Sequence, residues 1–153
     1  MIPEFENLSE HEVEGMFKAP ILVCLLIAGA DGRIDRREIN EVIKIAEKGQ
    51  KAQSAMGRYF SHLHADLEDK IMIVIQSYPK DPDEWTRQLV EELSLLNGIL
   101  EKVDRLFAVE FYAMLREMAQ KIASSSGGLL GINSVTAEEA RYLELPMLCP
   151  PAA

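Results

Sequence analysis

The stretch APILVCLLIAGADGRIDRREINEVI, residues 19–43, decides the fold because it holds an apolar run, a break and a second helix start. The run over residues 19–30 is apolar or small throughout, which predicts a core helix covered by neighbours on most sides. Asp31-Gly32 ends that helix, since glycine adopts left-handed backbone at low cost. Asp35 then suits an N-cap, with Glu38 at capping-box spacing. The stretch therefore predicts two helices joined by a tight acidic turn.

The segment before this stretch carries its own start signal. Ser9 and Glu12 also have capping-box spacing, which predicts a short helix from Ser9 to about Lys18. Pro20 has no backbone N–H and suits the first turn of a helix. We therefore predict that Pro20 begins a second helix, which ends near Ala30.

The remaining chain also favours helices. The third predicted helix starts after Asp35 and either continues or bends near Gly49 or Gly57. Asp66 is a candidate cap for a helix over residues 67–78, and Asp81 with Pro82 is a strong start signal for the next. Two long apolar stripes follow at helical spacing. They are Trp85, Leu89, Leu93, Leu96, Leu100 and Val103, and, after a break at Asp104, Phe107, Phe111, Met114, Leu115, Met118 and Ile122.

The end of the chain adds a loop, a last helix and a tail. SSSGGLLGINS, residues 124–134, is rich in glycine and serine and predicts a loop. Thr136 is a candidate cap for a last helix, with Glu139 at N3, and residues 147–153 predict an extended, proline-rich tail. No segment alternates with the period of two expected of strands. We predict a compact all-α bundle in a single domain, residues 1–153, in which both stripes form core.

Composition and net charge favour some classes of binding partner and location over others. Apolar residues make up 48% of the chain, and the formal net charge is -9. That charge disfavours nucleic-acid binding and suits cations or basic partners. The apolar run is too short to span a bilayer, so we expect a cytoplasmic protein with no direct membrane insertion. The run predicts that Cys24 is a small buried hydrophobe.

The acidic turn resembles half of an EF-hand loop. With Gly32 at loop position 6, ligands would come from Asp31, the Arg33 carbonyl, Asp35 and Glu38. Positions 1 and 3 become residues 27 and 29, which offer no side-chain oxygen. A single-loop EF-hand is therefore not expected, and helix capping explains most of the turn. Asp31 fits capping poorly, because a carboxylate near a helix C-terminus is unfavourable.

Two motifs together resemble a known family. LLIAGADGRIDRREINEVIKI, residues 25–45, and ASSSGGLLGINSVTAEEARYLELP, residues 123–146, are similar to motifs of the TerB-like tellurite-resistance superfamily, which includes the N-terminal domain of the DjlA co-chaperones. The resemblance covers roughly residues 12–146 and implies a bundle of about seven helices. It also implies a metal-holding acidic cluster where the two turns meet, and it implies no catalytic activity.

Carried to matching positions, the resemblance selects Asp31 and Glu38 from the first turn and Glu139 from the second. Asp35 and Glu138 are weaker candidates. Thr136 stands where the first turn has Asp35, which argues against a symmetric arrangement of two metals. Oxygen ligands favour Ca²⁺ or Mg²⁺ over Zn²⁺.

Three functional hypotheses follow, of which an enzyme with a carboxylate-bound metal ranks below the other two. The first is a non-enzymatic accessory protein of stress or tellurite resistance that binds a divalent cation at the two turns. The alternative is a metal-free protein–protein interaction module whose carboxylates only cap helices and whose partner docks on an exposed helix face. His62 and His64 point to nearly opposite sides of a helix and share no ion. If the helix ends there, His64 could hold a metal together with Asp66 or Asp69. No motif indicates an organic cofactor or catalysis.

Overall fold

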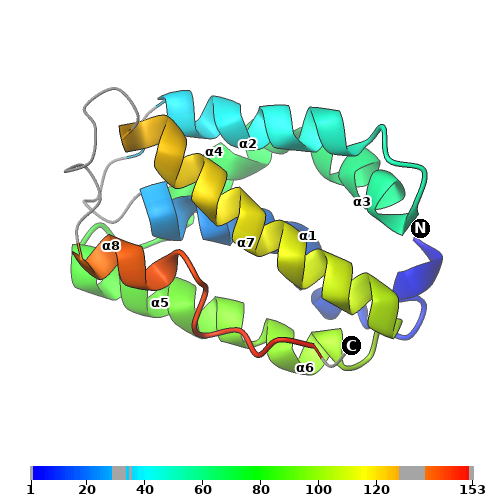
Figure 1. The fold of residues 1–153 in the computed structure, drawn as a ribbon. Helices are drawn as coiled ribbons and strands as arrows, with labels where there is room; N and C mark the ends of the chain where they lie inside the picture. The colour runs from blue at the N-terminus through cyan, green and yellow to red at the C-terminus, as the bar shows by residue number, and fades with distance from the viewer. Residues whose placement is uncertain (1, 29–33, 35, 128–136, 152–153) are drawn as a thin grey trace.

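In a computed structural model, residues 2–28, 34, 36–127 and 137–151 are described, and within them the prediction of an all-α bundle is confirmed (Figure 1). No described helix is both long and apolar enough to cross a membrane. The elements are η1 (Pro3–Phe5), α1 (Glu10–Ala28), α2 (Arg36–Gly49), α3 (Ala55–His64), α4 (Leu67–Ser77), α5 (Pro82–Ser94), α6 (Leu96–Leu100), α7 (Arg105–Gly127) and α8 (Ala137–Tyr142).

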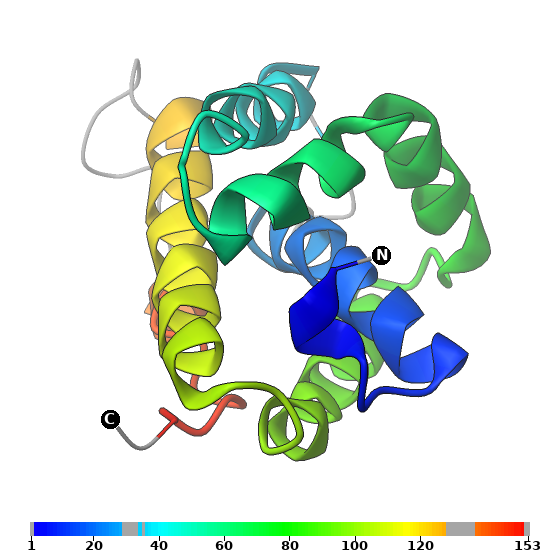
Figure 2. The ribbon, with the colours of Figure 1, turned by 90° about the vertical axis from the view of Figure 1, so that its right-hand side faces the viewer.

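Helix α1 is the centre of the bundle. It packs against α7, α5, α2 and α6, and Figure 2 shows it surrounded by the other helices. From Ala19 to Ala28 every residue is buried, as the apolar run predicts. A helix covered on all sides in this way gains its stability from its neighbours rather than from its own propensity.

The predicted helix break at Pro20 is wrong, because α1 runs through it. A proline inside a helix removes the N–H that would bond the carbonyl four residues earlier, which here belongs to Met16. The Tyr59 hydroxyl of α3 donates a hydrogen bond of 2.7 Å to that same Met16 carbonyl. A buried side chain thus replaces the missing backbone donor, and the helix continues.

Tyr59 also lies in an aromatic cluster that ties the N-terminal segment to the bundle. Its ring stacks on Phe17 at 5.1 Å and meets Phe111 edge-on at 5.2 Å. Phe5 of η1 contacts Phe107 edge-on at 5.5 Å. Burial of these large rings is a major source of stability for a helical core.

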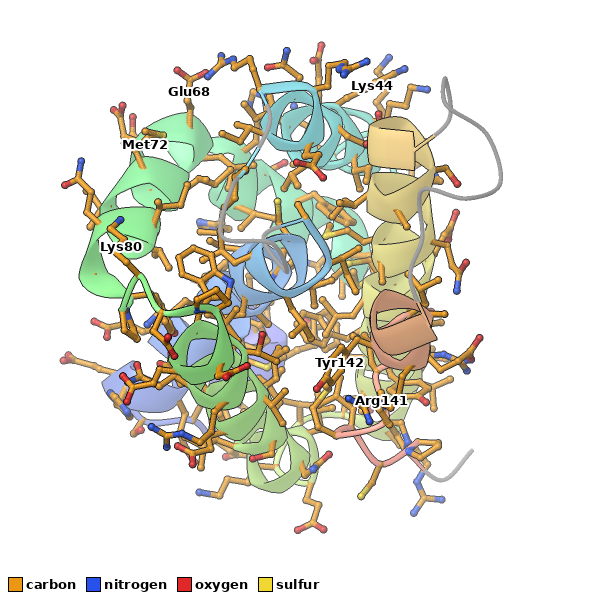
Figure 3. The ribbon with its side chains drawn as sticks, turned by 90° about the vertical axis from the view of Figure 1, so that its left-hand side faces the viewer. Lys44, Glu68, Met72, Lys80, Arg141 and Tyr142 are labelled. Carbon is orange, nitrogen blue, oxygen red and sulfur yellow. The ribbon has the colours of Figure 1, made fainter. Side chains whose placement is uncertain are left out.

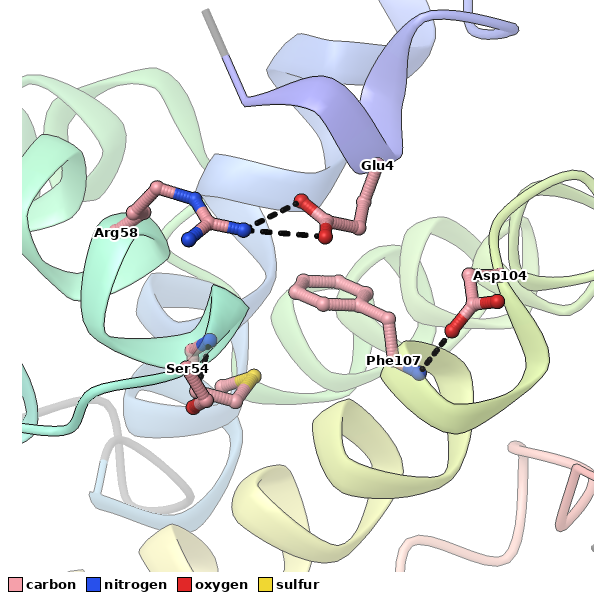
Figure 4. A network of polar contacts seen from close by, with 6 residues as sticks. Glu4, Ser54, Arg58, Asp104 and Phe107 are labelled. Carbon is pink, nitrogen blue, oxygen red and sulfur yellow. Dashed lines mark hydrogen bonds and ion pairs between the residues drawn. The ribbon is translucent and has the colours of Figure 1, made fainter.

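An exposed ion pair lies beside this cluster. Glu4 of η1 accepts from Arg58 of α3 at 3.2 Å (Figure 4). The same view shows Asp104 accepting from the Phe107 backbone N–H at 3.3 Å, which confirms the predicted break at Asp104 and the start of α7.

Two of the predicted helix starts are confirmed in detail. The Ser9 hydroxyl accepts from the Glu12 N–H at 3.1 Å while Glu12 accepts from the Ser9 N–H at 2.9 Å. Asp81 accepts from the Glu84 N–H at 3.1 Å, ahead of Pro82. These caps satisfy backbone donors that a helix N-terminus otherwise leaves without partners.

Asp66 occupies the predicted position but does not cap α4 through its side chain. Its backbone is left-handed, with φ of 58°, so the carboxylate is not placed over the first turn. Asp is among the residues that tolerate this conformation. The residue serves the turn between α3 and α4 instead of the helix start.

The breaks between α2 and α3 and within the fifth predicted helix come from local geometry. Helix α2 ends at Gly49, and Ser54 caps α3 through the Met56 N–H at 3.3 Å. The predicted helix over residues 82–103 divides at Leu95, whose N–H bonds the Glu92 carbonyl at 3.2 Å. That tighter turn starts α6. All residues of the predicted stripe from Trp85 to Val103 are nevertheless buried.

The predicted loop at residue 124 begins too early, since α7 continues to Gly127. The Ser125 hydroxyl donates to the Ile122 carbonyl at 2.8 Å, and this local bond is one that serine makes readily within a helix.

The C-terminal segment packs against α6. The Asn97 side chain donates to the Met147 carbonyl at 3.0 Å and accepts from the Cys149 N–H at 2.8 Å. Leu145 and Leu148 are buried beneath this contact.

Candidate functional site

The predicted cation site is only partly within the described residues. Asp31, Arg33 and Asp35 lie outside them, as does Thr136. Glu138 and Glu139 belong to α8, but their side chains also lie outside the described part of the structure. Within the described ranges, no group of three or more His, Cys, Asp or Glu side chains could hold a metal ion. This includes His64, which lies at the end of α3.

Glu38 is the described member of that site, and its position is unusual. Of the charged residues that the structure describes, Glu38 alone is buried in the core, with 4% of its surface exposed. It lies in the first turn of α2, where a carboxylate is favoured by the helix dipole. A carboxylate buried to this degree requires polar or ionic partners.

The electrostatic effect of Glu38 reaches α1. Burial, and after it the charge of Glu38, raises the pKa of the Cys24 thiol to about 12. Cys24 is therefore protonated at neutral pH, and the prediction that it behaves as a small buried hydrophobe is confirmed. Near the end of α1, the Trp85 indole N–H donates to the Leu25 carbonyl at 3.2 Å. The buried end of α1 thus lies between the first turns of α2 and α5.

A groove with a volume of about 630 Å³ lies between α2 and α7. We call it the α2–α7 groove. Its apolar lining consists of Ile45, Phe60, Met114 and Met118. The sequence predicts that Met114 lies in the core, but it is only half-buried, because it also lines the groove. The thioether side chains of methionine adapt to differently shaped partners.

The edges of the α2–α7 groove carry lysines. Lys44 and Lys48 are one turn apart on α2, and Lys121 lies across the groove on α7. Lys121 pairs with Glu117 at 3.1 Å. Lys44 and Lys48 have no ion-pair partner among the described residues. Glu41 also lines the α2 edge and Glu117 the α7 edge, so the lysines of the groove outnumber its carboxylates by three to two. We call Lys44 and Lys48 the basic strip, in a chain with a formal charge of -9.

A second surface is formed by the outer face of α4. Met72 and Ile73 are 42% and 65% exposed, while Leu67 and Ile71 attach the helix to the core. Figure 3 shows Met72 and Glu68 on the outer edge of the molecule, well apart from Lys44. A pocket of about 170 Å³ beside Met72 is lined by Ile39, Ile75 and Trp85 among others, with Lys80 at its side.

Comparison with known proteins does not assign a family. No protein-family model, curated protein or solved structure matches the chain. The TerB-like resemblance therefore stays a prediction from the two motifs.

Sequence reasoning missed both surfaces. One signal was present for the groove: Lys44 and Lys48 at helical spacing beside Ile45. Whether α2 and α7 leave an open groove depends on how two segments far apart in the chain pack, which periodicity does not report. For α4, Met72 and Ile73 interrupt the polar face of an otherwise amphipathic helix, and this signal is visible in the sequence.

Proposed function

We propose that this protein is a non-enzymatic interaction module whose α2–α7 groove receives an amphipathic helix with acidic flanks. The observation that carries the proposal is the pairing of an apolar floor with the basic strip of Lys44 and Lys48. An open groove between helices suits the mode in which a partner helix lays its apolar face into it. Carboxylates on the flanks of that helix would lie against the two lysines, and so charge complementarity selects the partner.

The test is a titration of labelled protein with two model peptides, followed by NMR amide shifts. Both peptides carry leucine at helical spacing, and their flanks carry glutamate in one and lysine in the other. We expect the acidic peptide to shift amides along α2 and α7 around the groove, and the basic peptide to bind more weakly. Binding should weaken with added salt, because exposed charge pairs are screened.

Charge reversal sharpens this test. In the double variant Lys44→Glu/Lys48→Glu we expect binding of the acidic peptide to weaken roughly tenfold, since attractive pairs of up to about 1 kcal/mol each become repulsive. The control Arg87→Glu/Arg105→Glu changes the net charge equally at exposed sites away from the groove and should bind like the wild type. Equal loss in both variants, or no groove shifts with either peptide, would contradict the proposal.

The buried carboxylate of Glu38 supports a second candidate, cation binding at the acidic turn. A divalent ion held by Asp31, Glu38 and Glu139 would neutralise charge that burial disfavours. We expect Ca²⁺ or Mg²⁺ to raise the stability of chelator-treated protein by about 2.7 kcal/mol at a hundredfold excess over Kd. Thermal unfolding with Ca²⁺, Mg²⁺, Mn²⁺ and Zn²⁺ measures this gain.

The variants Asp31→Asn and Glu38→Gln should lose the ion-dependent gain, whereas Glu47→Gln, exposed on the same helix as Glu38, should keep it. If Glu38→Gln instead lowers stability by the same amount with and without ions, its carboxylate only supports the start of α2, and the cation proposal fails.

A further inference from the structure

Helix α4 leaves an apolar face that the described parts of this chain do not cover. Met72 and Ile73 are adjacent on that face, and they are among the few large hydrophobic side chains with high exposure in the described structure. Asp69 lies one turn before them on the same face and Gln76 one turn after, at helical spacing of three to four residues. All four side chains are exposed.

We propose that two copies of this chain pair through their α4 helices, antiparallel, about a two-fold axis that passes between Met72 and Ile73. The register of the two paired helices supports this arrangement. Such an axis places Met72 of one copy against Ile73 of the other, and each exposed apolar group is covered by its neighbour. It also places Asp69 opposite Gln76, so that a carboxylate acceptor faces an amide donor on both sides of the axis.

The charges around α4 fit a second copy despite the acidic chain. Glu68 pairs with Arg36 at 2.6 Å, and the formal charges of Lys70 and Lys80 balance those of Asp66 and Asp69. The face is therefore close to neutral, while each whole chain has a formal charge of -9. The pocket beside Met72 offers further apolar wall to Ile73 of the second copy. This interface uses other residues than the α2–α7 groove, and it stands or falls independently of the proposed function.

The experiment is the mass of the full chain by sedimentation equilibrium, from micromolar to millimolar concentration. We expect a concentration-dependent approach to twice the chain mass of 17.2 kDa. The dimer should strengthen as salt is added, because the ions screen repulsion between two acidic chains. A monomer at every concentration and salt level would overturn the proposal and leave α4 to a different partner.

Ile73→Glu should give a monomer, and its thermal midpoint should equal that of the wild type at concentrations where the wild type is also monomeric, since Ile73 is 65% exposed and contributes little to the core. Leu95→Glu and Leu106→Glu are matched controls, because both side chains are equally exposed on other parts of the surface. Both should dimerise normally. A dimer that survives Ile73→Glu, or one that is lost equally in the controls, would refute the α4 interface.

A charge exchange tests the register itself. Gln76→Glu places two carboxylates opposite each other and should weaken the dimer at least severalfold. Adding Asp69→Lys then sets opposite charges across the axis and should restore it. If the double variant is as weak as Gln76→Glu, the proposed axis is wrong.

Discussion

Tyr59→Phe is expected to lower the free energy of unfolding by about 1–3 kcal/mol, although it removes a single oxygen atom. The hydroxyl donates to the Met16 carbonyl at 2.7 Å in a fully buried site. Pro20 has no N–H to take its place, so the carbonyl would be left buried without a donor. The phenylalanine ring keeps the stacking on Phe17 and the edge contact with Phe111, which isolates the hydrogen bond. Chemical denaturation of both proteins measures the difference.

The Pro20→Ala background provides the control for this interpretation. Alanine at position 20 restores an N–H that can donate to the Met16 carbonyl, and the Tyr59 hydroxyl then becomes less necessary. We expect Tyr59→Phe to cost about 1 kcal/mol less in the Pro20→Ala background than in the wild type, which is a coupling measurable by a double-mutant cycle. An equal cost in the two backgrounds would mean that the hydroxyl does not compensate for the proline.

Gly57→Ala is expected to destabilise the protein by about 1–3 kcal/mol, although alanine normally favours a helix. A methyl group at Gly57 would overlap the Ala52 carbonyl. Because that obstacle is backbone, a rotamer change does not relieve it, and the turn between α2 and α3 has to move. The change in thermal midpoint and in denaturant midpoint reports the cost.

Gly98→Ala is the matched control within α6. A methyl group there meets no atom within 4 Å, and so we expect it to be neutral or to stabilise the protein by up to about 1 kcal/mol. If both glycine variants gain stability alike, Gly57 is not required by the close approach of Ala52.

The parts of the fold that the sequence predicts are those determined by neighbouring residues. Ser9 with Glu12 and Asp81 with Glu84 form their caps within three residues, and so the residue types alone indicate where the helices start. The apolar stripe from Trp85 to Val103 likewise reports burial even where the helix divides, because periodicity marks a face and not its continuity.

The predictions fail where a residue far away in the sequence alters the local conformation. Pro20 interrupts an isolated helix, but Tyr59, 43 residues after Met16, supplies the missing donor. Asp66 would cap a helix in extended backbone, but the turn after α3 requires left-handed backbone there. These outcomes depend on how α1, α3 and α4 pack, and tertiary packing commonly overrides local preference.

The candidate sites also differ in how far the sequence predicts them. Glu38 could be selected from the sequence because capping-box spacing and the TerB-like resemblance both indicate it, yet its exposure of only 4% follows from the packing of α2 in the bundle. The α2–α7 groove needs Met114 and Ile45 to come together from helices separated by about half of the chain, and no local pattern contains that information.

The central place of α1 has a consequence for synthesis of the chain. The ribosome makes this helix before α7, which is its largest partner and follows α2 to α6 in the chain. At about 5–20 residues per second, the roughly 80 residues between α1 and the apolar part of α7 take about 4–16 s to appear. During that interval the apolar segment of α1 lacks the part of its cover that α7 provides, so we expect nascent chains to depend on chaperones more than the finished protein does.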